Sequence, residues 1–338
     1  MELRRRGRGD GASQAADSDS RAEMEPQRRA WPYMALLALQ YGIQPIISKR
    51  YSGKEVIIST TVLGCEIAKT VFALVFMFLD GSIWRLHKEW NAIDALTASA
   101  LPAGIYAVQN TLLQLSYRHL DSLTFSLLNQ TKLLFTAVFM FFLLGITQTK
   151  QQIGALLLLV SAAVLLSFGQ KSSKSSADVD PESTLILGVI PILVASMLSG
   201  LASTLCQWAA QVKRRSTYLM TVEMSTFGSL FLIASLLKSP DGEAIRRRGY
   251  FSGWTTLTLL PLFTNAFGGI LVGLVTTYAG GVRKGFVIVS ALVVTALLQF
   301  ALEDIPPSIY VLVAMPMVIS STVIYQRYSG VSKKKKAS

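Results

Sequence analysis

The chain has 338 residues, of which 51% are hydrophobic and 15% are charged, and its formal net charge is +12. Soluble domains carry about 25% charged residues, so this composition excludes a disordered protein, a nucleic-acid-binding domain and most soluble enzymes. In a chain this apolar, an excess of Lys and Arg is typical of the basic cytosolic loops of a membrane protein.

The N-terminal segment and the cysteines set further limits. Residues 1–30 are polar and rich in Arg, without an apolar core, which predicts a disordered cytosolic tail rather than a signal peptide. Cys65 and Cys206 both lie in apolar runs, and the two histidines cannot form a metal centre alone. We therefore expect neither a disulfide framework nor a cysteine metal site.

Apolar stretches long enough to cross a bilayer occur ten times along the chain. A transmembrane helix needs about 20 mostly apolar residues, and the candidates are 31–49, 56–79, 94–117, 121–144, 150–169, 184–210, 216–238, 254–279, 283–302 and 306–326. The sequence therefore predicts an all-α membrane protein with a ten-helix transporter domain over 31–326, followed by a basic cytosolic tail over 327–338.

The polar segment 170–183 divides the ten helices into halves of five, at about 31–169 and 184–326. Because five is odd, two homologous halves would have opposite membrane orientations, which is the inverted-repeat architecture of many transporters. If the N-terminus is cytosolic, 18 basic residues lie on the cytosolic side and 10 on the other. The positive-inside rule therefore predicts that both termini are cytosolic.

Ionisable residues inside spans cost about 2.5–3.5 kcal/mol on insertion scales and are therefore candidates for a functional site. Glu66 and Lys69 are three residues apart on one helical face, so they can pair, either as a cavity-lining pair or as a structural ion pair. Lys132 lies near the middle of the fourth span with no acidic residue within a turn, which favours an anionic ligand over a partner on another helix. Glu223 needs a partner or a proton.

Two more groups in the second half are candidates. Arg283 and Lys284 begin the ninth span beside glycines, and they read equally well as an interfacial basic cap or as a site. If the halves are inverted repeats, Lys132 and Lys284 face one central cavity. Gly268 and Gly269 in the eighth span favour close helix packing over a flexible gate.

Enzyme signatures are missing from the sequence: there is no HExxH, nucleophile elbow, P-loop or dinucleotide fingerprint. We therefore expect a protein that is not an enzyme. The alternative to a transporter is an intramembrane enzyme without a known motif, or a membrane receptor that does not transport.

Several of these segments resemble nucleotide-sugar transporters. The YAVQN sequence at 106–110, with the turn at Leu120-Asp121 and the span that reaches Lys132, resembles the family's third and fourth helices. The segment 59–69 resembles the second, and 268–286 resembles the eighth and ninth. The resemblance covers most of residues 31–326 and points to the branch that carries CMP-sialic acid, UDP-galactose and UDP-N-acetylglucosamine.

The resemblance implies exchange of a cytosolic nucleotide sugar for a lumenal nucleoside monophosphate, CMP or UMP. CMP-sialic acid is the leading expectation, and UDP-N-acetylglucosamine, UDP-N-acetylgalactosamine and UDP-galactose are the alternatives. Tyr106 and Asn110 would contact the base and ribose, and the lysines would supply the counter-charge, so no metal or cofactor is expected. The implied substrate-binding residues are Tyr106, Asn110, Lys132, Lys284, Glu66, Lys69, Asn129, Gly268 and Gly269.

The chain departs from the family pattern in the fourth, sixth and seventh helices, and these departures bear on the choice of sugar. The Tyr seven residues before the helix-four lysine is Phe125 here. The candidates for gating or sugar selectivity are Phe125, Ser199, Gln207, Glu223, Tyr278 and Arg283.

The C-terminus places Lys335 and Lys336 fourth and third from the end. This spacing resembles a dilysine retrieval signal bound by cytosolic coat proteins, which predicts residence in the endoplasmic reticulum, the Golgi or both. The alternative is a basic tail that binds anionic lipid, at about 1 kcal/mol per Lys. The expected partners are thus substrate, bilayer and coat proteins, without nucleic acid, and a homodimer is left open.

Overall fold

The computed structural model describes residues 30–53, 55–84, 90–120, 125, 128–168, 184–303 and 307–328, and this part of the chain is helical almost throughout. The two terminal tails, including Lys335 and Lys336, lie outside the described residues, and so does the polar connection 170–183.

The long helices lie where the apolar stretches predicted them, with ends that shift by a few residues. The first helix covers 30–51, and the others are α2 (Ile58–Leu79), α4 (Ala92–Ala95) with η1 (Leu96–Ala100) and α5 (Leu101–His119), α7 (Thr131–Leu144), α8 (Lys150–Phe168), η2 (Thr184–Val189) with α10 (Ile190–Gln207) and η3 (Trp208–Val212), α11 (Thr217–Leu236), η4 (Thr256–Thr258) with α13 (Leu259–Ala279), α14 (Gly281–Glu303) and α15 (Ile309–Arg327).

One further helix lies in the polar segment 239–253, between the predicted spans 216–238 and 254–279. Helix α12 (Pro240–Arg248) begins with Pro240 at its first position, and the Ser239 side chain accepts a hydrogen bond from the Gly242 amide. Acidic residues occupy its first turn and arginines its last, which complements the helix dipole. Pro and Gly here therefore mark the ends of a short helix rather than a loop.

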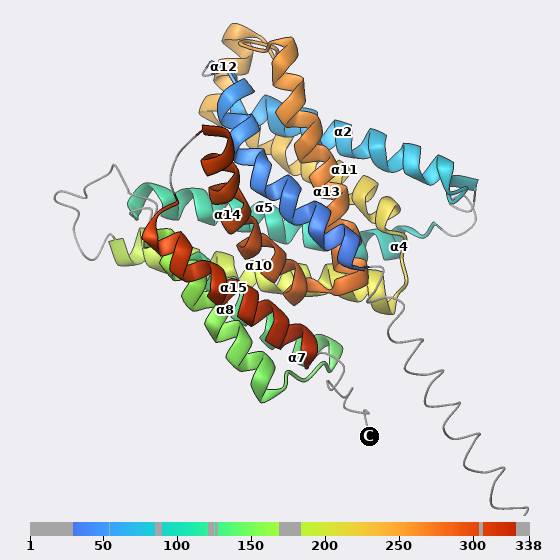
Figure 1. The fold of residues 1–338 in the computed structure, drawn as a ribbon. Helices are drawn as coiled ribbons and strands as arrows, with labels where there is room; N and C mark the ends of the chain where they lie inside the picture. Colours follow the sequence, from blue (N-terminus) through green and yellow to red (C-terminus); the bar gives the residue numbers. More distant parts are fainter. Residues whose placement is uncertain are drawn as a thin grey trace, which may run out of the picture.

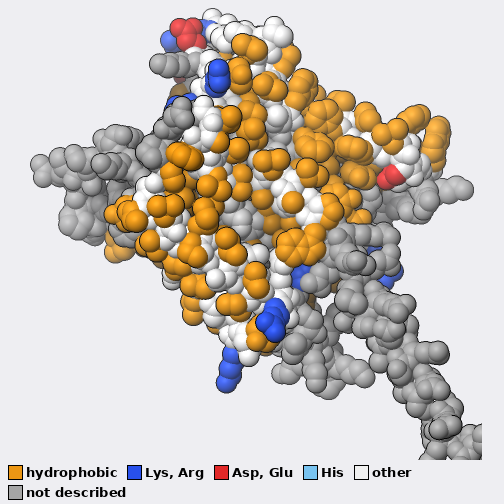
Figure 2. Space-filling view, in the orientation of Figure 1, with side chains coloured by type: hydrophobic (Ala, Val, Ile, Leu, Met, Phe, Trp, Pro, Cys, Tyr) orange, Lys and Arg blue, Asp and Glu red, His pale blue; other side chains and the backbone are white. Residues whose placement is uncertain are grey.

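The exterior of the bundle is apolar, as a bilayer requires. In the described part of the chain, six helices are long and apolar enough to cross a membrane, and two shorter apolar helices, Thr131–Leu144 and Lys150–Leu166, accompany them. Figure 2 shows hydrophobic side chains over most of one face, with the visible charges near the ends of the bundle. The protein is thus a multi-pass membrane protein, and the full count of ten spans stays a prediction.

The helices pack into one bundle that brings the two halves of the sequence together. Helix α8 lies along α15 at one edge (Figure 1). Helix α10 packs against both α5 and α7, and α2 packs against both α11 and α13. The largest apolar core joins α7 and α8 from the first half to α14 and α15 from the second.

Candidate functional site

The two candidate lysines occupy the first turns of neighbouring helices. Helix α14 begins at Gly281, which places Lys284 where the sequence predicted it. Helix α7 begins at Thr131, after a turn at Gln130, so Lys132 lies in its first turn rather than in mid-helix. The Thr131 hydroxyl donates to the Leu128 carbonyl at 2.6 Å, a local bond of the kind that competes with a regular helix.

Lys132 and Lys284 lie deep among protein atoms and close enough for their positive charges to repel each other. Both residues nevertheless keep an intermediate accessible surface. Among the described residues neither lysine pairs with an acid. The Lys284 Nζ atom donates to Ser203 Oγ at 2.9 Å.

Glycines on α14 allow this close approach. A Cβ atom on Gly285 would collide with the Leu133 side chain of α7. A Cβ atom on Gly281 would lie 2.9 Å from Ser203 Oγ and 3.3 Å from Thr136 Cγ2. The bare backbone of α14 thus fits against α7 and α10, which brings the helix that carries Lys284 next to the helix that carries Lys132.

Three further residues complete this cluster, which we call the lysine site: Lys132, Lys284, Tyr106, Tyr41, Ser203 and Cys206. Tyr106 of α5 lies next to Ser203 and packs against Cys206 of α10. Tyr41 of the first helix lies within the range of electrostatic interaction with Tyr106. Cys206 is also near Lys284. Tyr41 was missed by the sequence analysis, although a Gln-Tyr pair inside an apolar helix was a signal for it.

Gln207 holds the turn that precedes Lys284. Its Oε1 atom accepts from the Gly281 amide at 2.7 Å, and its Nε2 atom donates to Gln211 at 2.8 Å. Gln211 in turn donates to the Thr277 carbonyl at 2.9 Å, at the end of α13. The two glutamines therefore tie the α13–α14 turn to α10, and Gln207 acts on the site through the backbone.

The predicted Glu66–Lys69 pair is formed, with Lys69 Nζ 2.6 Å from Glu66 Oε1. Lys69 covers Gly269 of α13, and Gln40 of the first helix covers Gly268. Both glycines therefore receive protein side chains, which supports the packing interpretation of the sequence.

The other candidates differ in their surroundings. Asn110 is exposed, whereas its neighbour Gln109 is buried and its Oε1 atom has no hydrogen-bond partner among the described residues. Asn129 and Ser199 are half-buried.

Three aromatic or basic candidates contact neighbouring rings. Phe125 meets Tyr117 edge-on with ring centroids 5.2 Å apart. Tyr278 stacks on Tyr33 at 5.4 Å. Arg283 lies near Tyr325 of α15, on the side of α14 that faces the large apolar core. These contacts give Tyr278 and Arg283 packing roles in this conformation.

Glu223 finds its partners at one end of the bundle. It forms an ion pair with Arg215, and both side chains are buried. It also accepts from Ser99 Oγ at 2.7 Å and from Trp90 Nε1 at 3.0 Å. The carboxylate therefore joins α11 to η1 and to Trp90, which precedes α4. The Arg215 guanidinium supplies its counter-charge.

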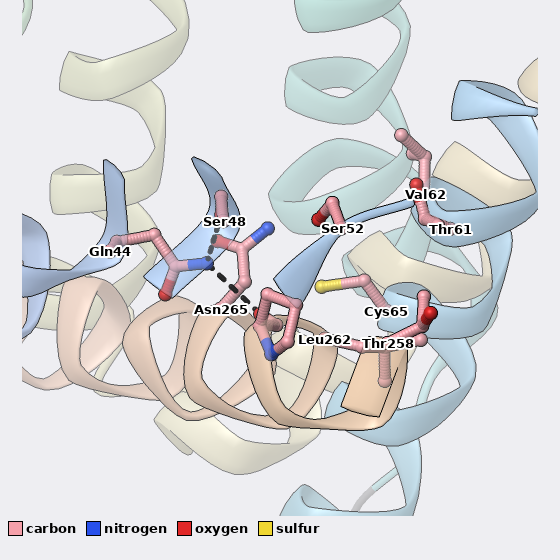
Figure 3. Close-up of a pocket in the computed structure, with 10 residues that line it drawn as sticks. Gln44, Ser48, Ser52, Thr61, Val62, Cys65, Thr258, Leu262 and Asn265 are labelled. Carbon is pink, nitrogen blue, oxygen red and sulfur yellow. Dashed lines mark hydrogen bonds between the residues drawn. The ribbon is translucent and has the colours of Figure 1, made fainter. Parts of the chain in front are cut away.

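Two pockets lie at opposite ends of α2. The smaller one, of about 100 Å³, is uncharged and polar, and it is bordered by the first helix, the start of α2 and the start of α13. In Figure 3, Gln44 reaches both Ser48 and the Pro261 carbonyl beside this pocket, at 3.2 and 3.0 Å. The larger one contains Met77 and Ser82 at the other end of α2, together with three consecutive basic residues.

The fold and the site define a class of protein. Two lysines without an acidic partner in the interior of an apolar bundle are costly as cations, because a buried charge needs a counter-charge. The lysine site thus places two basic side chains without an acidic partner among the described residues inside the helix bundle of a multi-pass membrane protein.

Comparison with known proteins identifies the family. The model of the nucleotide-sugar transporter family matches residues 33–326. The chain therefore belongs to the nucleotide-sugar transporter family, as the sequence resemblance indicated.

Individual relatives in this family are named as transporters of UDP-sugars. The chain is similar to the UDP-N-acetylglucosamine transporter ROCK1 of Arabidopsis thaliana, with 62% identity over 90% of this chain and 94% of the relative. It is 27% identical to the human UDP-N-acetylglucosamine transporter over 83% of this chain and 90% of the relative. It is 25% identical to the dog UDP-galactose translocator over 96% and 86%. A solved protein crystal structure shares the fold, with a TM-score of 0.65, 13% identity and coverage of 92% and 99%.

Proposed function

We propose that the protein exchanges cytosolic UDP-N-acetylglucosamine for lumenal UMP by alternating access, with the nucleotide bound at the lysine site. The observation that carries this proposal is that Lys132 and Lys284 lie in the bundle interior without an acidic partner among the described residues. The sugar is inferred from the relative with 62% identity, which is named a UDP-N-acetylglucosamine transporter. The expectation of CMP-sialic acid gains no support from the comparisons, so one of its alternatives replaces it.

The site residues divide the ligand between them. Lys132 and Lys284 neutralise the diphosphate through charge-assisted hydrogen bonds. Tyr106 and Tyr41 offer aromatic faces for the uracil ring. The unsatisfied Gln109 Oε1 atom is an acceptor one helical turn from Tyr106, suited to the N–H group of uracil or to a ribose hydroxyl.

The same lysines explain strict exchange. In an occluded state without ligand, two like charges would be buried together without an anion, which is costly. Nucleotide sugar or UMP removes that cost. The loaded carrier therefore crosses the barrier more readily than the empty carrier, and an ion gradient is unnecessary.

The helix packing supports ten spans arranged as inverted repeats. In such a fold each helix of the first half corresponds to the helix five positions later, and contacts recur under that exchange. Helices α2 and α11 pack together as one corresponding pair, and α8 and α15 as another. The first helix corresponds to α10, and α13 and α14 correspond to α5 and α7. Helix α10 packs on α5 and α7, and the first helix likewise contacts α13 and α14. Gln40 donates to the Thr264 carbonyl at 3.0 Å, and Thr295 donates to the Gly42 carbonyl at 3.0 Å.

In this proposal both termini are cytosolic and the protein resides in the endoplasmic reticulum, the Golgi or both. The basic residue bias supports the orientation, and Lys335 and Lys336 support the compartment. The larger pocket beside Lys213 then faces the cytosol, and the smaller one beside Ser48 faces the lumen.

Counterflow tests the proposal. Purified protein in sealed liposomes preloaded with UMP should take up UDP-N-acetylglucosamine faster than liposomes loaded with buffer. Unlabelled UDP-N-acetylglucosamine should compete more strongly than UDP-galactose or CMP-sialic acid. Equal uptake with and without internal UMP would exclude exchange, and stronger competition by CMP-sialic acid would exclude the assigned sugar. A receptor that does not transport would show binding without uptake.

A further inference from the structure

The larger pocket is a basic recess at the end of the bundle, separate from the lysine site. It has a volume of about 330 Å³ and is bordered by the end of α2, η1, η3 and the start of α11. We call it the basic pocket; its polar and aromatic lining is Ser82, Asp94, Thr97, Trp208, Lys213, Arg214, Arg215 and Ser216.

Arg214 occupies a backbone position that favours glycine. Its φ of 52° lies in the left-handed region, and it is the one residue other than glycine with positive φ in the described part of the chain. The Arg215 amide donates to the Ala209 carbonyl at 3.1 Å, so the α10–η3 helix ends with Arg214 in the left-handed conformation that Gly usually takes after a helix. A side chain there costs about 1 kcal/mol, which points to a use for this guanidinium.

The two neighbouring basic residues are already engaged. Lys213 pairs with Asp94 at 3.4 Å and lies 5.3 Å from the centre of the Trp208 ring. Arg215 is bound to Glu223. Arg214 is exposed and has no ion-pair partner among the residues that the structure describes. The pocket therefore has a fixed frame with one free guanidinium.

Helix α11 adds a second, independent feature for an anion. Ser216 and Leu219, at its N-terminus, line the pocket. The Ser216 side chain does not cap this 20-residue helix, and its first turn contains no acidic residue. The first amide groups of α11 thus remain available beside Arg214, at the positive end of the helix dipole.

A buried apolar cluster, which we call the apolar layer, adjoins both the basic pocket and the lysine site and shares Cys206 with the latter. It consists of Ala98, Cys206, Ala209, Ala210 and Met220. Trp208 and Tyr106 both pack against this layer; Trp208 lines the basic pocket and Tyr106 belongs to the lysine site. The two sites are therefore distinct in this conformation.

We propose that the basic pocket binds the phosphate group of an anionic ligand through Arg214 and the N-terminus of α11, as a second site on the cytosolic side of the apolar layer. Two sources share this chemistry: the diphosphate of the incoming nucleotide sugar and the headgroup of an anionic phospholipid. The inference of a cytosolic side rests on the proposed function, whereas the pocket itself does not.

Binding of inorganic pyrophosphate tests the pocket directly. In full-length protein in detergent, with the lysine site disabled by Lys132→Met and Lys284→Met, pyrophosphate should still raise the melting temperature. Adding Arg214→Gly should raise the half-saturating pyrophosphate concentration about tenfold or more, because a charge-assisted hydrogen bond is lost. Arg214→Lys should retain most of the affinity, and Lys238→Gln should control for net charge. An unchanged titration with Arg214→Gly would overturn the proposal.

Misfolding is not expected to account for a loss of pyrophosphate affinity in the Arg214→Gly variant. Glycine fits the left-handed backbone, so the variant should melt at the same temperature as its parent or higher without ligand. If the Met variants do not fold, the same comparison is made in the parent protein with the salt dependence of uptake: substrate uptake should fall with added salt, and Arg214→Gly should weaken that dependence. Equal salt dependence would count against the pocket.

Transport in vesicles of stated composition separates the two sources. If the ligand is the nucleotide sugar, Arg214→Gly should raise the KM for UDP-N-acetylglucosamine about 3–10-fold, with unchanged maximal rate, in pure phosphatidylcholine. If the ligand is a headgroup, parent and variant should differ only when the vesicles contain phosphatidylinositol 4-phosphate. Parent protein that binds pyrophosphate in this pocket but shows no counterflow would contradict the proposed function and leave the pocket standing.

Discussion

Lys132 of α7 and Lys284 of α14 lie close enough in the bundle interior for their charges to repel, and Lys284 donates to Ser203 of α10 at 2.9 Å. The three helices come from both halves of the sequence. A single anion between the lysines would therefore link the halves, and the removal of that anion would leave the like charges opposed.

The glycine contact beneath the lysines gives the first prediction. Gly285→Ala should lower the melting temperature and the exchange rate, because its methyl group overlaps with the buried Leu133 side chain, which must repack between α7 and α14. We expect a loss of about 1–3 kcal/mol of stability. Gly154→Ala in α8 is the matched control, since no atom lies within 4 Å of its added Cβ. Equal melting temperatures for the two variants would show that this contact is not tight.

A second prediction concerns the buried carboxylate of Glu223. Glu223→Gln should destabilise the protein by about 3–5 kcal/mol, because it leaves the buried Arg215 guanidinium without a counter-charge. The double variant Glu223→Gln with Arg215→Met should recover part of this loss. Thermal unfolding of the single and double variants measures the coupling, and purely additive losses would contradict a direct ion pair.

The nucleotide preference gives a third prediction. UMP should raise the melting temperature of the purified protein, and GMP should not, because the relatives named here carry UDP-sugars. CMP should stabilise less than UMP. Equal stabilisation by UMP and GMP would contradict recognition of a pyrimidine base at the Tyr106 end of the site.

A fourth prediction concerns the C-terminal tail, which lies outside the described residues. Replacing Lys335 and Lys336 by Ser should shift the protein from the endoplasmic reticulum toward the Golgi, while exchange in liposomes stays unchanged. Imaging in cells measures the shift. An unchanged distribution would favour the lipid-binding interpretation, because the spans alone hold the protein in the membrane.

The sequence predicted the long helices well because apolar length is a strong signal, and each long described helix overlaps one of the predicted ranges. It also predicted the Glu66–Lys69 pair, since residues three apart on a helix are neighbours. Contacts between distant segments were harder. Tyr41 near Tyr106, and Arg215 on Glu223, depend on tertiary packing that periodicity does not report.

Local chemistry explains the remaining differences. Helix α12 was missed because the search was for long apolar stretches, whereas this helix is short and polar, with Pro240 at its start and Gly249 after its end. Asn110 was favoured by resemblance, and the structure turns Gln109 inward instead. The choice of sugar was not settled by the sequence, because the departures at Phe125 and in the sixth and seventh helices gave no positive signal for one ligand.

The most direct test of the central claim measures counterflow with the lysine charges removed. Lys132→Met and Lys284→Met should each reduce UMP-driven uptake of UDP-N-acetylglucosamine at least about tenfold, which corresponds to the loss of a charge-assisted hydrogen bond. Lys150→Met, at the exposed start of α8, should behave like the parent. Melting temperatures at or above that of the parent would show that the Met variants are folded, because they bury no charge. Near-normal uptake by either folded variant would contradict the account that this pair of lysines binds the nucleotide.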